Sequence, residues 1–304
     1  QETWLAKAYH CRERLREGAG DMEGALYDEN AAVHVLRQKE MLTDGEELQI
    51  GEILLKRARS YAALERMDNA WKELSEAIPL FEKHRNGQGA EQMEELYLTR
   101  ISLARRSGED SCLFYDYEQL LALYEKKARE MKKDGQEQMG KKIASVYLER
   151  GNAYGGRGMY EKALRDFDQA ILSLIPYPSL AYSELAASAY GSKGNILMKQ
   201  KKYRDALHHF TESVKIREKL YESKEPEAGV PLARSYGNRG AALDVLGRDE
   251  EAFEAYQKAI AIRLEVFDRT SFSQAFGLAQ VYLNRGILNG KHGKIMEEIM
   301  DYTH

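Results

Sequence analysis

The chain has 304 residues, of which 43% are hydrophobic and 31% are charged, and its formal net charge is −4 at pH 7. This composition is typical of a soluble helical protein, and the negative balance gives no overall attraction to nucleic acid. No stretch approaches the roughly 18 apolar residues of a membrane-spanning helix, and Cys11 and Cys112 are too few for a disulfide framework. We therefore expect a cytoplasmic protein without nucleic-acid or membrane partners.

Along the chain one pattern of spaced residues returns, faint at first and then clear. The last four copies share the octet Ala-x-x-Tyr-x-x-Arg/Lys-Gly, at residues 144–151, 187–194, 233–240 and 279–286. Three weaker copies precede them, and the first of these has Glu13 where a small residue belongs. The residues that end the seven octets are numbers 13, 58, 101, 151, 194, 240 and 286. Such a period indicates stacked structural units, each too small to bury its own apolar face.

Each octet is followed by a second apolar pattern at helical spacing. After Gly151 the chain has Gly158, which breaks the helix, and then Ala163, Phe167 and Ala170. The pattern resembles the tetratricopeptide repeat, in which a small residue of helix A packs on helix B. The resemblance implies an all-α, right-handed α-solenoid over residues 1–304, with about fourteen helices in about seven antiparallel pairs and no sheet. We expect the small residue to face the alanines of helix B.

The repeats are longer than the roughly 34 residues usual for this family. We expect the extra residues to form additional helical turns and a short loop, and Pro79 to end or kink its helix early. The charged run at 125–142 is interpreted as a solvated helix and loop, with an electrostatic docking site as the alternative. In length and layout the repeats resemble those of kinesin light chain and of the Leu-Gly-Asn repeat proteins, although these have Leu-Gly where this chain has Arg-Gly.

The last repeat stops inside its expected helix B. We interpret the chain as a piece of a longer protein, with a degenerate natural end as the alternative. On the first interpretation the apolar face of the final repeat is partly exposed or covered by another copy of the chain, which allows self-association. The residues of that face are Tyr282, Ile287, Ile295 and Ile299.

No cluster of residues predicts catalysis, a metal or a cofactor. His208 and His209 are adjacent on a helix and point about 100° apart, so we interpret them as a surface pair. The run GNAYGGRG at 151–158 lacks the strand and the Gly-Lys-Ser/Thr ending of a phosphate loop. We therefore predict that the chain is not an enzyme.

A basic residue precedes the small residue in all seven copies. These residues are Arg12, Arg57, Arg100, Arg150, Lys193, Arg239 and Arg285. In one interpretation each stem packs between helices while its charge meets an acidic group on a neighbouring helix. In the other interpretation they form a basic ladder that binds an acidic tail or an RNA backbone. The negative net charge argues against RNA.

The expected binding residues lie on the helices A. In tetratricopeptide arrays helix A lines the concave face, and polar residues occupy its exposed positions here. The candidates for peptide binding are Asn152, Asn195, Asn238, Asn284, Arg234 and Arg59. An amide carries both a donor and an acceptor, so a series of asparagines can hold the backbone of an extended peptide whatever its side chains. The alternative is a solvated polar surface. The carboxylate clamp of some chaperone-binding members is present only in fragments, and we do not predict it.

The sequence therefore predicts an interaction scaffold that binds a peptide or protein segment in its concave groove. The second hypothesis is a regulatory or sensor portion of a larger signalling protein, such as a transcription regulator or a protease-linked protein. The sequence of the whole protein beyond His304 would distinguish the two.

Overall fold

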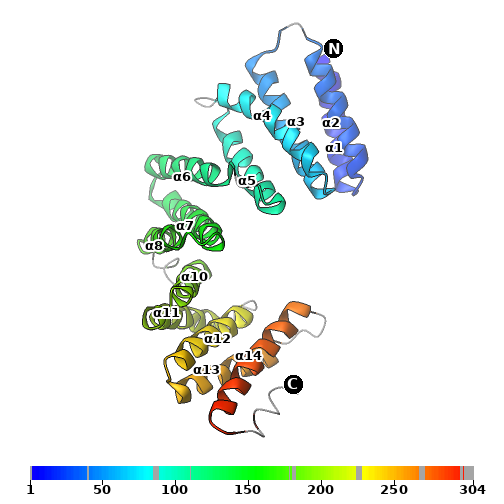
Figure 1. Ribbon diagram of the computed structural model, residues 1–304. Helices are drawn as coiled ribbons and strands as arrows, with labels where there is room; N and C mark the ends of the chain where they lie inside the picture. The colour runs from blue at the N-terminus through cyan, green and yellow to red at the C-terminus, as the bar shows by residue number, and fades with distance from the viewer. Residues whose placement is uncertain are drawn as a thin grey trace. The chain divides into compact units, whose positions relative to one another are not determined.

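The structure is all helical. The computed structural model describes residues 2–39, 41–84, 89–109, 111–177, 179, 183–223, 228–266, 271–294 and 297. Over these residues it contains thirteen α-helices and no strand, which confirms the predicted fold class (Figure 1). The helices are α1 (Glu2–Gly18), α2 (Met22–Arg37), α3 (Asp44–Ala63), α4 (Met67–Lys83), α5 (Ala90–Ser107), α6 (Leu113–Glu130), α7 (Lys133–Gly156), α8 (Tyr160–Leu174), α10 (Glu184–Lys199), α11 (Tyr203–Glu222), α12 (Gly229–Val245), α13 (Asp249–Glu265) and α14 (Phe272–Lys291).

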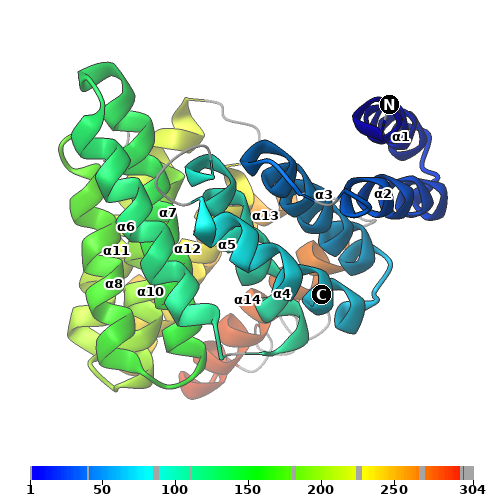
Figure 2. The same cartoon turned by 90° about the horizontal axis from the view of Figure 1, so that it is seen from above.

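The chain forms two compact units, residues 1–123 and 124–304, with α6 at the division. In the first unit α1 packs on α2 and α3 on α4, and α2 also contacts α3. In the second unit α7 pairs with α8, α10 with α11 and α12 with α13, and each pair also contacts the next (Figure 2). Short turns join the two helices of a pair, so the members run antiparallel.

The turn inside each helix pair uses a left-handed backbone conformation. A residue with positive φ lies seven positions after each of the seven predicted anchors, at Gly20, Glu65, Gly108, Gly158, Lys201, Gly247 and Gly293. Glycine adopts this conformation without the steric cost that a Cβ imposes. The common offset is what a seven-fold repetition of one helix–turn–helix unit produces.

The small residue of helix A faces an aromatic ring. A Cβ placed on Gly194 would lie 2.6 Å from a ring carbon of Phe210, and one on Gly240 would lie 2.7 Å from Tyr256. Our expectation that these glycines face the alanines of helix B was therefore wrong. The alanines, such as Ala206, are fully buried beside the ring, and the glycine provides the space that the ring fills.

The basic residue of the octet pairs with helix B, as the first interpretation predicted. In the first four repeats it meets an acid sixteen residues later, in the pairs Arg12–Asp28, Arg57–Glu73, Arg100–Asp116 and Arg150–Asp166. The equivalent positions of the next two repeats hold His209 and Ala255. There Lys193 contacts Asp168 at 2.5 Å, and Arg239 stacks 5.0 Å from the ring centre of Tyr236. The arginines of the first four repeats and Lys193 therefore pair with acids on neighbouring helices, whereas Arg239 stacks on a tyrosine of its own helix.

Three local expectations need correction or comment. Pro79 does not end its helix, because α4 continues to Lys83. The charged run at 125–142 is almost entirely helical, since α6 ends at Glu130 and α7 begins at Lys133. At the end of the chain Tyr282 is buried with only 8% of its surface exposed, against expectation, whereas Ile287 is 44% exposed. Ile295 and Ile299 lie outside the described residues.

The core of the second unit runs continuously through α11, α12, α13 and α14. Its largest side chains, Tyr236, Tyr256 and Tyr282, come from three successive helices. Because each helix pair buries the apolar face of the next, stability is distributed along the stack. No helix among the described residues combines the length and the apolar character needed to cross a membrane.

Candidate functional site

Four of the predicted binding residues lie on the helices A of the second unit. Asn152 is on α7, Asn195 on α10, Asn238 on α12 and Asn284 on α14. Asn152 and Asn195 are exposed, and Asn238 and Asn284 are half-buried. The structure brings two of them together, because the amide nitrogen of Asn238 donates to the side-chain oxygen of Asn195 at 3.4 Å. These two amides therefore share one face across two neighbouring helices.

The same face continues along α12 and α14. Arg234 is exposed and lies four residues before Asn238, so the two side chains are neighbours on the helix surface. The equivalent pair on α14 is Gln280 and Asn284, in which the Gln280 amide donates to the Asn284 oxygen at 3.2 Å. Each of these two helices therefore carries two polar side chains one turn apart on this face.

Arg59 is not part of this group. It lies on α3 in the first unit, where it forms an ion pair with Glu95 of α5. Both side chains are about half exposed, at 48% and 47%, so water screens the pair and a competing ligand could displace it.

Sequence reasoning missed a cluster of polar side chains where α10, α11 and α12 meet. The buried Arg217 of α11 reaches Glu184 at the start of α10, with Nε 2.9 Å from one carboxylate oxygen. Its remaining donors meet the hydroxyls of Ser188, Ser213 and Ser235. The available signal was an arginine 23 residues after the small residue in two successive repeats, at Arg217 and Arg263.

A separate cleft lies between α8, α10 and α11. Its volume is about 540 Å³, with an apolar base that includes Ile171, Leu174 and Ile216 and a charged rim that includes Lys215 and Glu222. The predicted asparagines do not line it. The second unit therefore offers two different surfaces to a partner.

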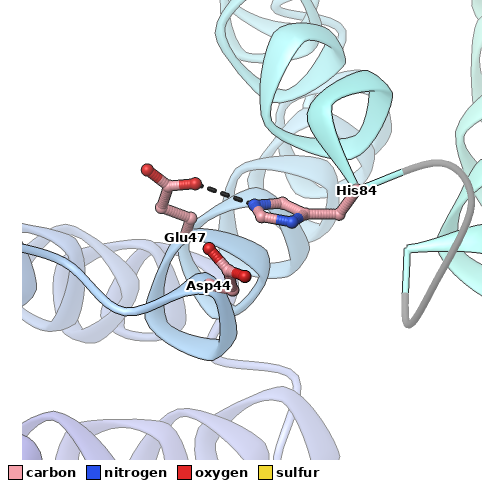
Figure 3. A group of neighbouring side chains, drawn as sticks. All are labelled: Asp44, Glu47 and His84. Atoms are coloured by element: carbon pink, nitrogen blue, oxygen red, sulfur yellow. Dashed lines mark hydrogen bonds and ion pairs between the residues drawn. The ribbon is translucent and has the colours of Figure 1, made fainter.

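Three potential metal ligands meet in the first unit, where the sequence predicted none. Asp44 and Glu47 on the first turn of α3 point toward His84 at the end of α4, and their ligand atoms lie within 4.8 Å of one another (Figure 3). His84 Nε2 is 2.8 Å from Glu47, and Lys83 donates to the same carboxylate at 2.6 Å. These hydrogen bonds, that of Lys83 foremost, lower the pKa of Glu47 below its ordinary value. Because a metal ion would have to displace Lys83, the cluster acts as an ion-pair clip between the helix ends.

The buried Asp116 and the half-buried His209 have strongly shifted pKa values. Burial raises the pKa of Asp116 to about 6, and the charge of Arg100 and a hydrogen bond from the Cys112 thiol only partly compensate. Burial, together with the charges of Lys193 and His208, lowers the pKa of His209 to about 4. The His209 ring stacks on Tyr190 with ring centres 5.9 Å apart. His209 is therefore a neutral packing residue, and not half of an exposed histidine pair.

Comparison with known proteins identifies the class. Residues 185–265 match the tetratricopeptide repeat family. No curated protein sequence matches the chain. Among solved structures, aspartyl phosphate phosphatase F from Bacillus subtilis has a TM-score of 0.58 at 15% identity, covering 100% of this chain and 73% of that one. BtubC (BKLC) from P. vanneervenii has a TM-score of 0.56 at 15% identity, covering 86% of this chain and 89% of that one.

A third similar structure is the signal transduction ATPase with numerous domains PH0952 from Pyrococcus horikoshii, described as having a tetratricopeptide repeat sensor. Its TM-score is 0.53 at 16% identity, and the match covers 97% of this chain and 44% of that one. At these identities the likeness concerns the fold. The fold defines a helical-repeat scaffold of the kind that serves protein interaction.

The family match over residues 185–265 and the similar solved structures bear out the resemblance to the tetratricopeptide repeat that the octets and helix pairs predicted. The narrower resemblance to the kinesin light chain type stays a prediction.

Proposed function

We propose that the chain binds an extended peptide or protein segment along the helices A of its second unit, with no catalysis of its own. The observation that supports this most is the contact between Asn195 and Asn238 across two neighbouring helices. Paired amides of this kind can open to donate to and accept from the backbone of a segment laid across both helices. Asn152 and Asn284 extend the series on the helices to either side.

The proposal also draws on what these side chains do not do. Asn195 is exposed, and its contact with Asn238 is a long hydrogen bond of 3.4 Å at the surface, so the amide can exchange this neighbour for a ligand. The partner is accordingly a protein or peptide. Cys11 and Cys112 are unpaired thiols, which supports the cytoplasmic location.

The test is the double variant Asn195→Ala/Asn238→Ala. A partner is first isolated with the full-length protein and identified by mass spectrometry, and calorimetry then measures its affinity. Binding should weaken by roughly 1–3 kcal/mol, the scale of one or two hydrogen bonds left unmade. The matched control is Gln169→Ala/Gln257→Ala, which removes two exposed amides from the helices B α8 and α13. Equal affinities for the two double variants, or a segment mapped to the cleft between α8 and α11, would refute the groove.

The second candidate is a sensor or regulatory portion of a larger signalling protein. It draws support from the similar fold of PH0952, whose match covers 97% of this chain. The two candidates share the groove and differ in what the groove controls. Sequencing the complete gene distinguishes them, since an effector domain on the same polypeptide supports the sensor and its absence supports a free scaffold.

A further inference from the structure

Two arginines occupy the same slot on successive helices B. Arg217 on α11 and Arg263 on α13 are 46 residues apart, which is also the step between the anchors Gly194 and Gly240. Both are almost fully buried, with 6% and 8% of their surfaces exposed. The two repeats can therefore be compared directly, residue by residue, as two versions of one site.

In the first version the buried cation is fully matched. Glu184 accepts from Arg217 Nε at 3.1 and 2.9 Å and also from its terminal nitrogen. The hydroxyls of Ser188 and Ser213 accept at 2.9 and 3.0 Å, and Ser235 accepts at 2.5 Å. In this repeat the chain itself therefore supplies a carboxylate and three hydroxyls to the buried guanidinium.

In the second version every one of these partners is replaced. Moving each by 46 residues gives Val230, Arg234, Ala259 and Val281. Among the described residues, Arg263 has neither a hydrogen-bond acceptor nor a carboxylate within ion-pair distance, and its buried Nε is left without a partner. A buried cation without a counter-charge is strongly unfavourable. The slot therefore has the same cation but lacks its carboxylate.

The Arg263 guanidinium lies against Gly277 of the neighbouring helix α14. A Cβ on Gly277 would lie 2.4 Å from one terminal nitrogen and 2.7 Å from the other, so the guanidinium occupies space that the glycine leaves open. The exposed Arg234 is the neighbouring cation, and burial, with a smaller effect from this charge, lowers the pKa of Arg263. Two positive groups thus converge beside the face that carries Asn238.

We propose that Arg263 and Arg234 bind a carboxylate of the partner segment, an aspartate or glutamate side chain, at the place where Glu184 serves Arg217 one repeat earlier. The proposal rests on the proposed peptide groove and adds a requirement for an acidic residue in the segment. A carboxylate is favoured because it is the anion that the preceding repeat places in the same slot, where a guanidinium can take it with two parallel hydrogen bonds. Arg234 lies one helical turn from Asn238, so one segment can contact both.

The first experiment needs no partner. Val230→Glu supplies the missing carboxylate from within the chain, and Val230→Gln is the matched control of equal size. The Glu variant should raise the unfolding midpoint by about 2–4 °C over the Gln variant, and Arg263→Met should abolish that difference. Arg263→Met alone should leave the midpoint equal or higher, whereas Arg217→Met should lower it. The proposal that Arg263 lacks a carboxylate partner is overturned if Val230→Glu does not raise the unfolding midpoint. It is also overturned if the increase persists in the presence of Arg263→Met.

The second experiment uses a displayed library of random dodecapeptides. Wild-type protein should select peptides with one acidic position, and replacing that residue by its amide should weaken binding about tenfold. The acidic preference should vanish with Val230→Glu. Amidation of the peptide C-terminus should have no effect, and a loss on amidation would assign the slot to a chain terminus and overturn the side-chain proposal. Groove-binding peptides without an acidic preference refute this inference alone. A library that selects nothing in the groove counts against the proposed function, while the stability test of the slot still stands.

Discussion

Two aspartates of the first unit hold the same place in the repeat, and removal of the charge is expected to destabilise the protein much more at one than at the other. Asp28 and Asp116 each lie sixteen residues after a basic residue of helix A, and both side chains are fully buried. Asp28 accepts from Arg12 Nε at 2.9 and 3.1 Å, and these bonds lower its pKa. Asp116 lies 3.1 Å from Arg100 Nε and accepts from the Cys112 thiol, yet burial raises its pKa to about 6.

At pH 7 the variant Asp28→Asn should destabilise the first unit by about 2–3 kcal/mol. It removes charged hydrogen bonds, each worth roughly 1.5–3 kcal/mol, although the half-exposed Arg12 can regain water. Asp116→Asn should cost less than about 1 kcal/mol at pH 7. The wild-type carboxylate is already penalised there by about 3 kcal/mol, from a shift of 3.8 to about 6 at 1.36 kcal/mol per unit.

The pH dependence provides the sharper test. A raised folded pKa means that the native state holds a proton that the unfolded state has lost, so wild-type stability falls as the pH rises from about 4 to 6. The free-energy difference between wild type and Asp116→Asn should therefore shift by about 2 kcal/mol over this range, in favour of the variant. The difference for Asp28→Asn should stay flat from pH 4 to 7, because a lowered pKa acts only at lower pH.

Urea denaturation followed by circular dichroism at pH 4, 5, 6 and 7 measures both differences. Carbon-13 carboxyl NMR of Asp116 gives its titration directly. A flat profile for Asp116→Asn, together with a carboxyl that titrates near pH 4, would refute the argument that burial controls the pKa of this carboxylate.

Further variants test the helix contacts and the remaining buried group. Gly194→Ala should destabilise by about 1–3 kcal/mol in thermal unfolding because its Cβ overlaps Phe210, whereas Gly156→Ala, with no atom within 4 Å, should be neutral or stabilising; equal effects contradict the ring contact. Lys201→Gly should stabilise by about 1 kcal/mol because residue 201 has φ 61°, and Gly247→Ala, at φ 70°, should lose a similar amount. His209, with its pKa lowered to about 4, should make wild-type stability fall by on the order of 2 kcal/mol as the pH drops from 6.5 toward 4, and His209→Phe should remove this loss; an unchanged acid profile speaks against a neutral, buried ring.

The fold was predictable because its determinants repeat in the sequence. Helical periodicity and the recurring octet indicate helix pairs without any knowledge of distant contacts. The left-handed turn was visible as glycine in five repeats and hidden in two, where Glu65 and Lys201 take the same conformation. Pro79 shows the limit of a local rule, since α4 continues through it to Lys83.

The chemistry of single sites was less predictable, because it depends on geometry that spacing does not determine. Arg12–Asp28 and Arg100–Asp116 have identical spacing, yet the two carboxylates have opposite pKa shifts. The cluster of Asp44, Glu47 and His84 joins residues about forty positions apart, and only the antiparallel pairing of α3 with α4 brings them together. Whether the asparagines bind a segment is likewise a property of the surface, and it stays a proposal.

Equivalent positions in successive repeats can be compared with one another, and the differences between them indicate where function lies. Repeat positions that hold the same residue in successive copies, such as the glycine that faces a ring, are accounted for by packing within the repeat. Packing does not account for a position that keeps a destabilising buried charge while the partners of that charge are replaced. Arg263 has kept the buried cation of Arg217, whereas its carboxylate has become Val230 and one of its hydroxyls has become the cation Arg234. Among the described residues no carboxylate offsets that arrangement, which is why we propose that its counterpart comes from a bound partner. For that reason we expect substitution of Arg263 to weaken binding of the partner without lowering stability. Substitution of the better-matched Arg217 should instead lower stability.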